Sequence, residues 1–103
     1  MNNTEIRNVI LDNSDFDISN IILFGSRAKT TNRIDSDYDL LIVSKKSLSL
    51  EKRRKVKKDL RIKFADLNID ADILVKSKEE VDKLKTSFGS VIKEAVNEGK
   101  EIL

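Results

Sequence analysis

The stretch Asp37-Tyr38-Asp39-Leu40-Leu41-Ile42-Val43 joins two acidic residues to an apolar run and predicts a strand that is polar where it begins. Residues two apart in a strand point to the same face, so Asp37 and Asp39 would lie about 7 Å apart on one side. Two carboxylates there repel each other and lose hydration, which is unfavourable unless a cation lies between them. Mg²⁺ is the natural cation, because it takes oxygen ligands from carboxylates and phosphates. A turn followed by an edge-strand charge is the alternative interpretation of the same pattern.

Upstream, the apolar run Ile21-Ile22-Leu23-Phe24 ends at Gly25-Ser26 and predicts a buried strand that leads into a turn. One helical turn is expected over residues 27–31. Glycine lets backbone N–H groups approach a ligand closely, and a helix N-terminus favours an anion. The turn therefore suits a phosphate, with the Ser26 hydroxyl as an extra donor. It is neither a Walker A loop nor a dinucleotide fingerprint, and on these residues alone an ordinary strand-to-helix turn with Ser26 as N-cap is the simpler interpretation.

A third strand is predicted downstream, over residues 69–75, and it contains Asp70 and Asp72. If this strand lies beside residues 37–40, one of the two acids can complete a cluster of three carboxylates. Three carboxylates around two cations form the arrangement that serves in-line phosphoryl transfer. Alternation places Asp70 and Asp72 on one face and does not choose between them. Both could also be solvent-facing polar positions.

The remaining periodicity predicts helices over residues 4–12, over residues 50–66, from a capping box at Ser77 and Glu80, and from Thr86 or Ser87 to Gly99. With the three strands, this order predicts an α/β or α+β fold over residues 1–103, a single domain with a small mixed central sheet and flanking helices. The helical side chains expected to face inward are Ile6, Val9, Ile10, Val56, Leu60, Phe64, Val81, Leu84, Val91, Ile92, Ala95 and Val96.

The composition excludes several kinds of chemistry. The 103 residues include no Cys and no His, which excludes disulfides, thiolate or imidazole metal sites, and Ser-His dyads. Catalysis would have to use carboxylates, hydroxyls, cations or hard metal ions. No apolar run approaches the roughly 20 residues that span a bilayer, and the N-terminus carries no signal segment. We therefore expect a cytoplasmic protein with no membrane partner.

Residues 51–63 contain eight Lys or Arg and two acidic residues, whereas the whole chain has a net charge of only +2. Such a face could attract acidic partners or nucleic acid. The simpler interpretation is the solvated side of an amphipathic helix. No aromatic residue interrupts the run to stack on bases, so nucleic acid is not expected as a direct substrate.

Taken together, Gly25-Ser26-Arg27-Ala28 and Ser36-Asp37-Tyr38-Asp39-Leu40 resemble the signature of the DNA polymerase beta-type nucleotidyltransferase superfamily. The short chain, with Asp72-Ile73-Leu74-Val75 and a last helix that ends at Glu98-Gly99-Lys100, is similar to the minimal nucleotidyltransferase (MNT) branch. The resemblance covers roughly residues 18–103. It implies a polymerase beta-like nucleotidyltransferase fold in a single minimal nucleotidyltransferase domain.

The resemblance implies that Gly25 and Ser26, with Arg27 beside them, bind the triphosphate of ATP. Family members commonly read Gly-Ser-x-Ala-Arg-Gly at this point, whereas Lys29-Thr30 follows the alanine here. Lysine keeps the positive charge of arginine but not its two-pronged geometry. Thr30 replaces the second glycine of the family pattern, so the chain departs from that pattern in the residues that make this loop tight.

The resemblance also assigns the acids. Asp37 and Asp39 would hold two Mg²⁺ ions. Asp72 would be the third carboxylate, shared with the catalytic metal and placed to take the proton of the acceptor. The Asp-plus-apolar context of the family favours Asp72 over Asp70, although alternation alone leaves both open.

For function, the resemblance implies the transfer of AMP from ATP to a hydroxyl, that of a tyrosine on a HEPN-domain toxin, with this chain as the antitoxin. One alternative is a non-catalytic binding module that neutralises its partner by occupancy. Another is an adenylyltransferase that acts on a small molecule. The sequence does not define the base preference, the number of nucleotides transferred or the oligomeric state.

Overall fold

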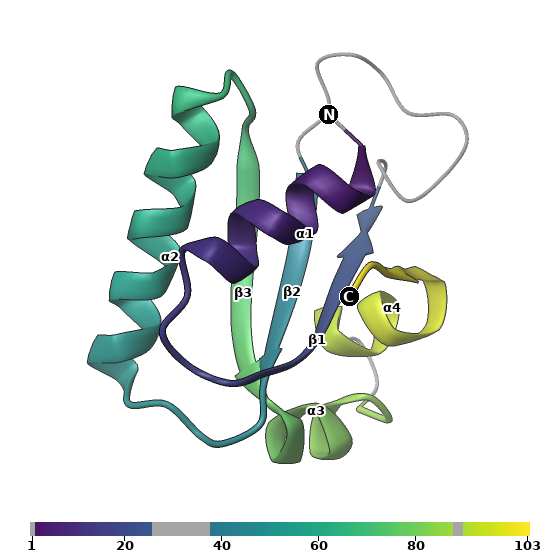
Figure 1. The fold of residues 1–103 in the computed structure, drawn as a ribbon. Helices are drawn as coiled ribbons and strands as arrows, with labels where there is room; N and C mark the ends of the chain where they lie inside the picture. The colour runs from purple at the N-terminus through teal and green to yellow at the C-terminus, as the bar shows by residue number, and fades with distance from the viewer. Residues whose placement is uncertain (1, 26–37, 88–89) are drawn as a thin grey trace.

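A computed structural model describes residues 2–25, 38–87 and 90–103 of the chain. The predicted helical turn over residues 27–31 lies outside these ranges. Figure 1 shows the elements in chain order: α1 (Asn3–Asp12), β1 (Ile18–Phe24), β2 (Tyr38–Ser44), α2 (Leu50–Asp66), β3 (Ala71–Ser77), α3 (Lys78–Leu84), α4 (Val91–Glu98) and β4 (Lys100–Glu101).

The strands form one sheet in the order β3-β2-β1-β4. Strand β2 runs parallel to β3 and antiparallel to β1, and β1 runs antiparallel to β4. The predicted α+β fold with a small mixed sheet and flanking helices is therefore confirmed. This topology brings the C-terminal end of β1 and the N-terminal ends of β2 and β3 together at one end of the sheet. The acidic residues were expected at this end.

The expectation of three strands is wrong, because β4 pairs with β1 as a fourth. Its pairing places Glu101 opposite Ile22 and Lys100 opposite Leu23. The backbone N–H of Ile102 then donates to the Ile21 carbonyl oxygen at 2.9 Å. A two-residue strand is too short to carry a period-two pattern, so the sequence gives no signal for it.

Helices cover both faces of the sheet. Helices α1 and α2 pack on one face through a cluster that includes Ile10, Leu60 and Phe64, all fully buried. Helices α3 and α4 pack on the other face through Val81, Ile92 and Ala95. The central strands are thus buried on both sides, which explains why residues 40–43 form a continuous apolar run rather than an alternating one.

Helix α2 spans the predicted residues 50–66. Its first turn is capped by the Ser49 hydroxyl, which accepts from the Lys52 backbone N–H at 3.1 Å. Val56, Leu60 and Phe64 are buried along one side, as their spacing of four predicts. Figure 1 shows α2 running alongside β3, which is an edge strand of the sheet.

The last two helices confirm part of the sequence prediction and correct the rest. The capping box of Ser77 and Glu80 begins α3. Helix α4, however, starts at Val91 after an N-cap at Ser90, not at Thr86 or Ser87. A helix of two turns has room for few inward positions, and Ile92 and Ala95 fill them.

The other two apolar side chains of α4 were expected to face inward and do not. Val91 is 50% exposed and Val96 is 36% exposed. Successive helical positions are rotated by about 100° from one another. The neighbours of Ile92 and Ala95 in the sequence therefore turn toward the rim of the buried face.

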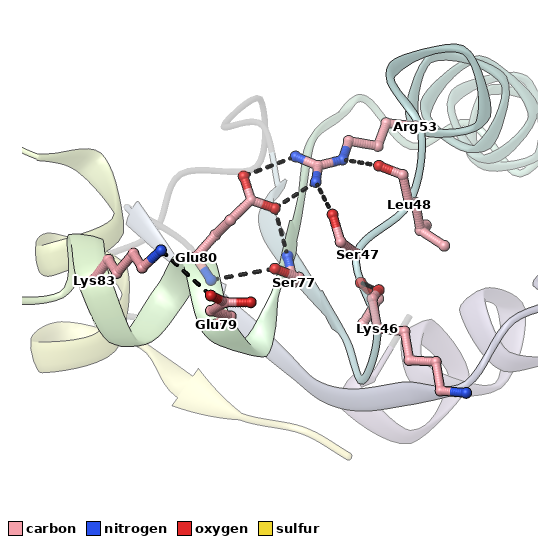
Figure 2. A network of polar contacts seen from close by, with 9 residues as sticks. Lys46, Ser47, Leu48, Arg53, Ser77, Glu79, Glu80 and Lys83 are labelled. Carbon is pink, nitrogen blue, oxygen red and sulfur yellow. Dashed lines mark hydrogen bonds and ion pairs between the residues drawn. The ribbon is translucent and has the colours of Figure 1, made fainter.

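An ion pair joins α2 to α3 where β2 and β3 end, and Figure 2 shows it from close by. Both terminal nitrogens of Arg53 donate to the Glu80 carboxylate, one of them at 3.0 Å. The Arg53 Nε also donates to the Leu48 carbonyl oxygen at 3.0 Å. Because the guanidinium stabilises the charged form, the pKa of Glu80 falls to about 2 from its ordinary 4.5.

Replacing Arg53 with Met keeps the apolar stem but removes the charge, and we expect it to lower the free energy of unfolding by about 1–2 kcal/mol at pH 7. Because the pKa of Glu80 is depressed in the folded state, this contribution is fully present above pH 4.5 and is lost as the pH falls toward 2. Urea unfolding at pH 7 and pH 3 should show the difference between the two proteins shrinking at pH 3.

The matched control is Lys83→Met, which removes the exposed ion pair of Lys83 with Glu79. That variant should change the stability by less than about 0.5 kcal/mol. Equal stability of Arg53→Met and the parent protein at pH 7 would show that the half-buried pair of Arg53 and Glu80 contributes nothing.

Candidate active site

Three strand ends meet at the candidate site. Asp39 pairs with Phe24, the last residue of β1, and with Asp72 near the start of β3. Because Asp39 and Asp72 are direct partners on neighbouring strands, their side chains leave the same face of the sheet. Asp39 is half-buried and Asp72 is exposed. Two carboxylates far apart in the sequence are thus adjacent in space.

Both acids line a cavity of about 380 Å³. It opens on the sheet face that α4 covers, and residues from β1, β2, α2, β3 and α4 surround it. Apolar side chains line it together with side chains of both charges. The lining residues are Phe24, Gly25, Asp39, Lys57, Arg61, Asp72, Ile73, Leu74, Val91 and Glu94.

Gly25 follows β1 directly and has a φ of 72°, the left-handed region that glycine adopts without strain. A Cβ atom at this position would overlap the Oδ2 oxygen of Asp39. The backbone of Gly25 therefore lies against the Asp39 carboxylate, and no side chain fits between them. Glycine therefore allows the backbone at residue 25 to approach Asp39, the candidate metal ligand, closely.

The structure distinguishes between the two acids of the third strand. Strand β3 begins at Ala71, so Asp70 precedes it, and the Asp70 carbonyl oxygen accepts from the Tyr38 backbone N–H at 3.0 Å. Only Asp72 lines the cavity that Gly25 and Asp39 share. Alternation could not separate the two acids, because the choice depends on the register between β2 and β3.

Three of the predicted site residues, Ser26, Arg27 and Asp37, lie outside the residues that the structure describes. Within the described ranges, no three acidic side chains gather closely enough to hold a metal ion. The described donors are the carboxylates of Asp39 and Asp72, which are hard oxygen ligands on adjacent strands. This donor set fits Mg²⁺, which one or two protein carboxylates commonly hold together with phosphate oxygens.

Lys57 and Arg61 of α2 were not expected at the site. The simpler interpretation of the basic run was a solvated helix face, yet both cations line the cavity with Asp72. Each follows by one position a buried residue of the apolar stripe, Val56 or Leu60. That offset turns the side chain toward the edge strand, and it is the sequence signal that could have revealed these residues.

The described part of the chain holds no helix with the length and apolar character that crossing a membrane requires.

The fold is similar to solved structures of toxin–antitoxin complexes. A complex with AMP-PNP contains a chain that is 22% identical, with a TM-score of 0.69 over 100% of this chain and 73% of that one. A mutant of the MntA–HpeT toxin–antitoxin pair gives 20% identity and a TM-score of 0.68, with the same coverage. The structure of a Shewanella oneidensis MNT antitoxin in complex with a tri-AMPylated HEPN toxin gives 20% identity and a TM-score of 0.61. The match covers 98% of this chain and 68% of that one.

No curated protein matches the sequence. The family model described as "Polymerase beta, Nucleotidyltransferase" matches residues 5–103. The match includes all three strand ends at the cavity, and the fold agrees with the solved structures above. This chain belongs to the polymerase beta nucleotidyltransferase family.

Proposed function

We propose that this chain is a Mg²⁺-dependent adenylyltransferase that transfers AMP from ATP to a tyrosine hydroxyl of a HEPN-domain toxin, and so acts as its antitoxin. The observation that carries the proposal is the single cavity shared by Gly25, Asp39 and Asp72. The family supports nucleotidyl transfer. Similar folds occur in an antitoxin bound to a tri-AMPylated HEPN toxin and in a complex with AMP-PNP, which supports the partner and the nucleotide.

In the proposed reaction, the hydroxyl oxygen of the acceptor forms a bond to the α-phosphorus of ATP. The bond from that phosphorus to the oxygen bridging to the β-phosphate breaks, and pyrophosphate leaves. The proton of the hydroxyl passes to the carboxylate of Asp72, which is exposed at the cavity and is the kind of base available to a chain without histidine.

Asp37, Asp39 and Asp72 are the proposed ligands of two Mg²⁺ ions, which when bound hold the triphosphate and stabilise charge on the attacking and leaving oxygens. Gly25, Ser26 and Arg27 are the proposed triphosphate-binding residues. Glycine at residue 25 lets the backbone adopt the left-handed conformation and lie against Asp39 without a clash.

In this proposal, residues 1–103 act as a single minimal nucleotidyltransferase domain in the cytoplasm. The domain contributes the nucleotide site, and the partner contributes the hydroxyl. A cavity of about 380 Å³ is within the range of small-molecule sites, so one nucleotide is a reasonable occupant.

The test uses the purified chain, its HEPN partner, Mg²⁺ and ATP labelled at the α-phosphate. We expect label on the partner, and none when the label is placed on the γ-phosphate, because pyrophosphate is the leaving group. Removal of the metal with EDTA should abolish labelling, and excess Mg²⁺ should restore it. Replacing the acceptor tyrosine of the partner with Phe should also abolish it.

The absence of α-phosphate label on the partner, at any Mg²⁺ concentration, would contradict the proposal. Label on a small hydroxylated compound instead of the partner would redirect it to that class of acceptor.

A further inference from the structure

A row of four cations follows the exposed side of α2. Arg54, Lys57, Lys58 and Arg61 are spaced by three and four positions, so their side chains lie on one side of the helix. Within residues 2–25, 38–87 and 90–103, none of the four has an ion-pair partner. Like charges at this spacing destabilise a helix. The row therefore works against helix stability unless an anion binds it.

Two other cations of the same helix are paired with acidic residues. Lys52 donates to both oxygens of Asp15, at 2.5 and 2.7 Å, and Arg53 pairs with Glu80. Near its N-terminus the helix thus has two cations that hold the fold together, whereas the row of Arg54, Lys57, Lys58 and Arg61 is unpaired among the described residues. The unpaired set is the one that faces the end of the sheet where the acids lie.

The unpaired cations line a shallow groove of about 710 Å³. Three of the residues that line this groove, Lys57, Arg61 and Asp72, also line the cavity that contains Asp39. The groove and the candidate active site are therefore continuous at Asp72, the proposed base. We call this surface the α2 groove; its lining residues are Arg54, Lys57, Lys58, Arg61, Ile62, Ala65, Ile69, Asp70, Ala71 and Asp72.

We propose that the α2 groove binds an acidic polypeptide segment of the acceptor protein and delivers its hydroxyl to Asp72. The inference rests on the proposed function and adds the chemistry by which the acceptor is recognised. Arg54 and Lys58 contact acidic side chains of the segment at the outer end of the groove. Lys57 and Arg61, at the junction with the cavity, guide the hydroxyl-bearing residue inward.

The groove suits a polypeptide better than a nucleic acid. Among the described residues that line it, none is aromatic, so bases find no stacking surface. Its apolar part is aliphatic, with Ile62 52% exposed, and suits the side chains of a peptide.

The experiment measures binding of a fluorescent random copolymer of Glu and Tyr, which provides acidic side chains and an acceptor hydroxyl together. The test variant is Arg54→Glu with Lys58→Glu, because these two residues line the groove and not the cavity with Asp39. We expect its dissociation constant for the copolymer to rise by about tenfold or more. Its affinity for AMP-PNP should remain within about twofold of the parent protein, since no nucleotide-site residue changes.

The matched control is Lys45→Glu with Lys46→Glu, which changes the net charge by the same amount. These exposed residues follow the end of β2, at the opposite end of the strand from Asp39. Figure 2 shows the Lys46 side chain pointing away from the Arg53–Glu80 network. The control should change copolymer affinity by less than about twofold.

The results separate the two proposals. Copolymer binding that depends on Arg54 and Lys58 supports the groove even if no AMP is transferred to any acceptor, which would overturn only the proposed function. Transfer to the partner together with equal copolymer affinity in the test and control variants would overturn the groove. Tighter binding of poly(U) than of the copolymer would also overturn it, in favour of nucleic acid.

Discussion

Asp39→Asn is expected to reduce transfer of AMP by about a thousandfold or more without unfolding the protein. Asn keeps the shape of the side chain, so the tight contact with the backbone of Gly25 can remain. It removes the negative charge, and a neutral amide is a poor ligand for a hard divalent cation. Initial rates of label transfer from α-labelled ATP, with thermal unfolding measured in parallel, would check both parts of this expectation.

Asp66→Asn is the control for this substitution, since Asp66 is exposed at the end of α2 and lines neither the cavity nor the α2 groove. It makes the same chemical change away from the site and should keep the rate within about twofold of the parent. A rate for Asp39→Asn as high as that of the control would show that Asp39 holds no catalytic metal.

The same variant distinguishes catalysis from occupancy. If the chain neutralises its partner by AMP transfer, Asp39→Asn should fail to protect cells that express the toxin. If binding alone is sufficient, protection should persist although no AMP is transferred. The second result would favour the non-catalytic binding module over the proposed enzyme.

Gly25→Ala is expected to lower the transfer rate by about a hundredfold, since small displacements of a catalytic group have effects of this size. The new methyl group would collide with the Asp39 carboxylate and force it to move. The left-handed backbone at this position adds a cost of about 1–3 kcal/mol in stability. Rates measured per folded molecule, together with urea unfolding, would separate the two effects.

Gly99→Ala provides the matched comparison. A Cβ atom there would crowd the Ala95 carbonyl oxygen and the Ile22 side chain, so this variant also loses stability. Gly99 does not line the site cavity, and the rate per folded molecule should stay close to that of the parent. A normal rate for Gly25→Ala would mean that the contact between residue 25 and Asp39 has no catalytic role.

Much of the fold could be predicted because local signals agreed with one another. In α2 the cap at Ser49 and the buried stripe of Val56, Leu60 and Phe64 mark the same helix. The continuous apolar runs of β1 and β2 reflect burial on both faces of the sheet. Elements with little periodicity were missed or misplaced, namely β4 with two residues and the start of α4.

The site was predicted less completely, because it depends on pairings between distant segments. That Asp72 and not Asp70 lines the cavity follows from its register with Asp39, which the alternation of residues within one strand does not encode. The approach of Lys57 and Arg61 depends on how α2 is rotated against β3, which also requires the tertiary structure. The catalytic, metal-binding and nucleotide-binding roles of all these residues remain predictions, and Ser26, Arg27 and Asp37 also lie outside the residues that the structure describes.

The carboxylates of Asp39 and Asp72 lie near the beginnings of β2 and β3. The ion pair of Arg53 with Glu80 lies where these two strands end. Five residue steps of extended chain, from Asp39 to Ser44 and from Asp72 to Ser77, separate these two ends by about 17 Å. Substitutions at the end with the ion pair can therefore change the thermal stability without altering the rate of AMP transfer at the end with the acids. A more heat-stable form of this small domain is best sought among substitutions that contact Arg53 and Glu80, other than at Arg54 of the α2 groove.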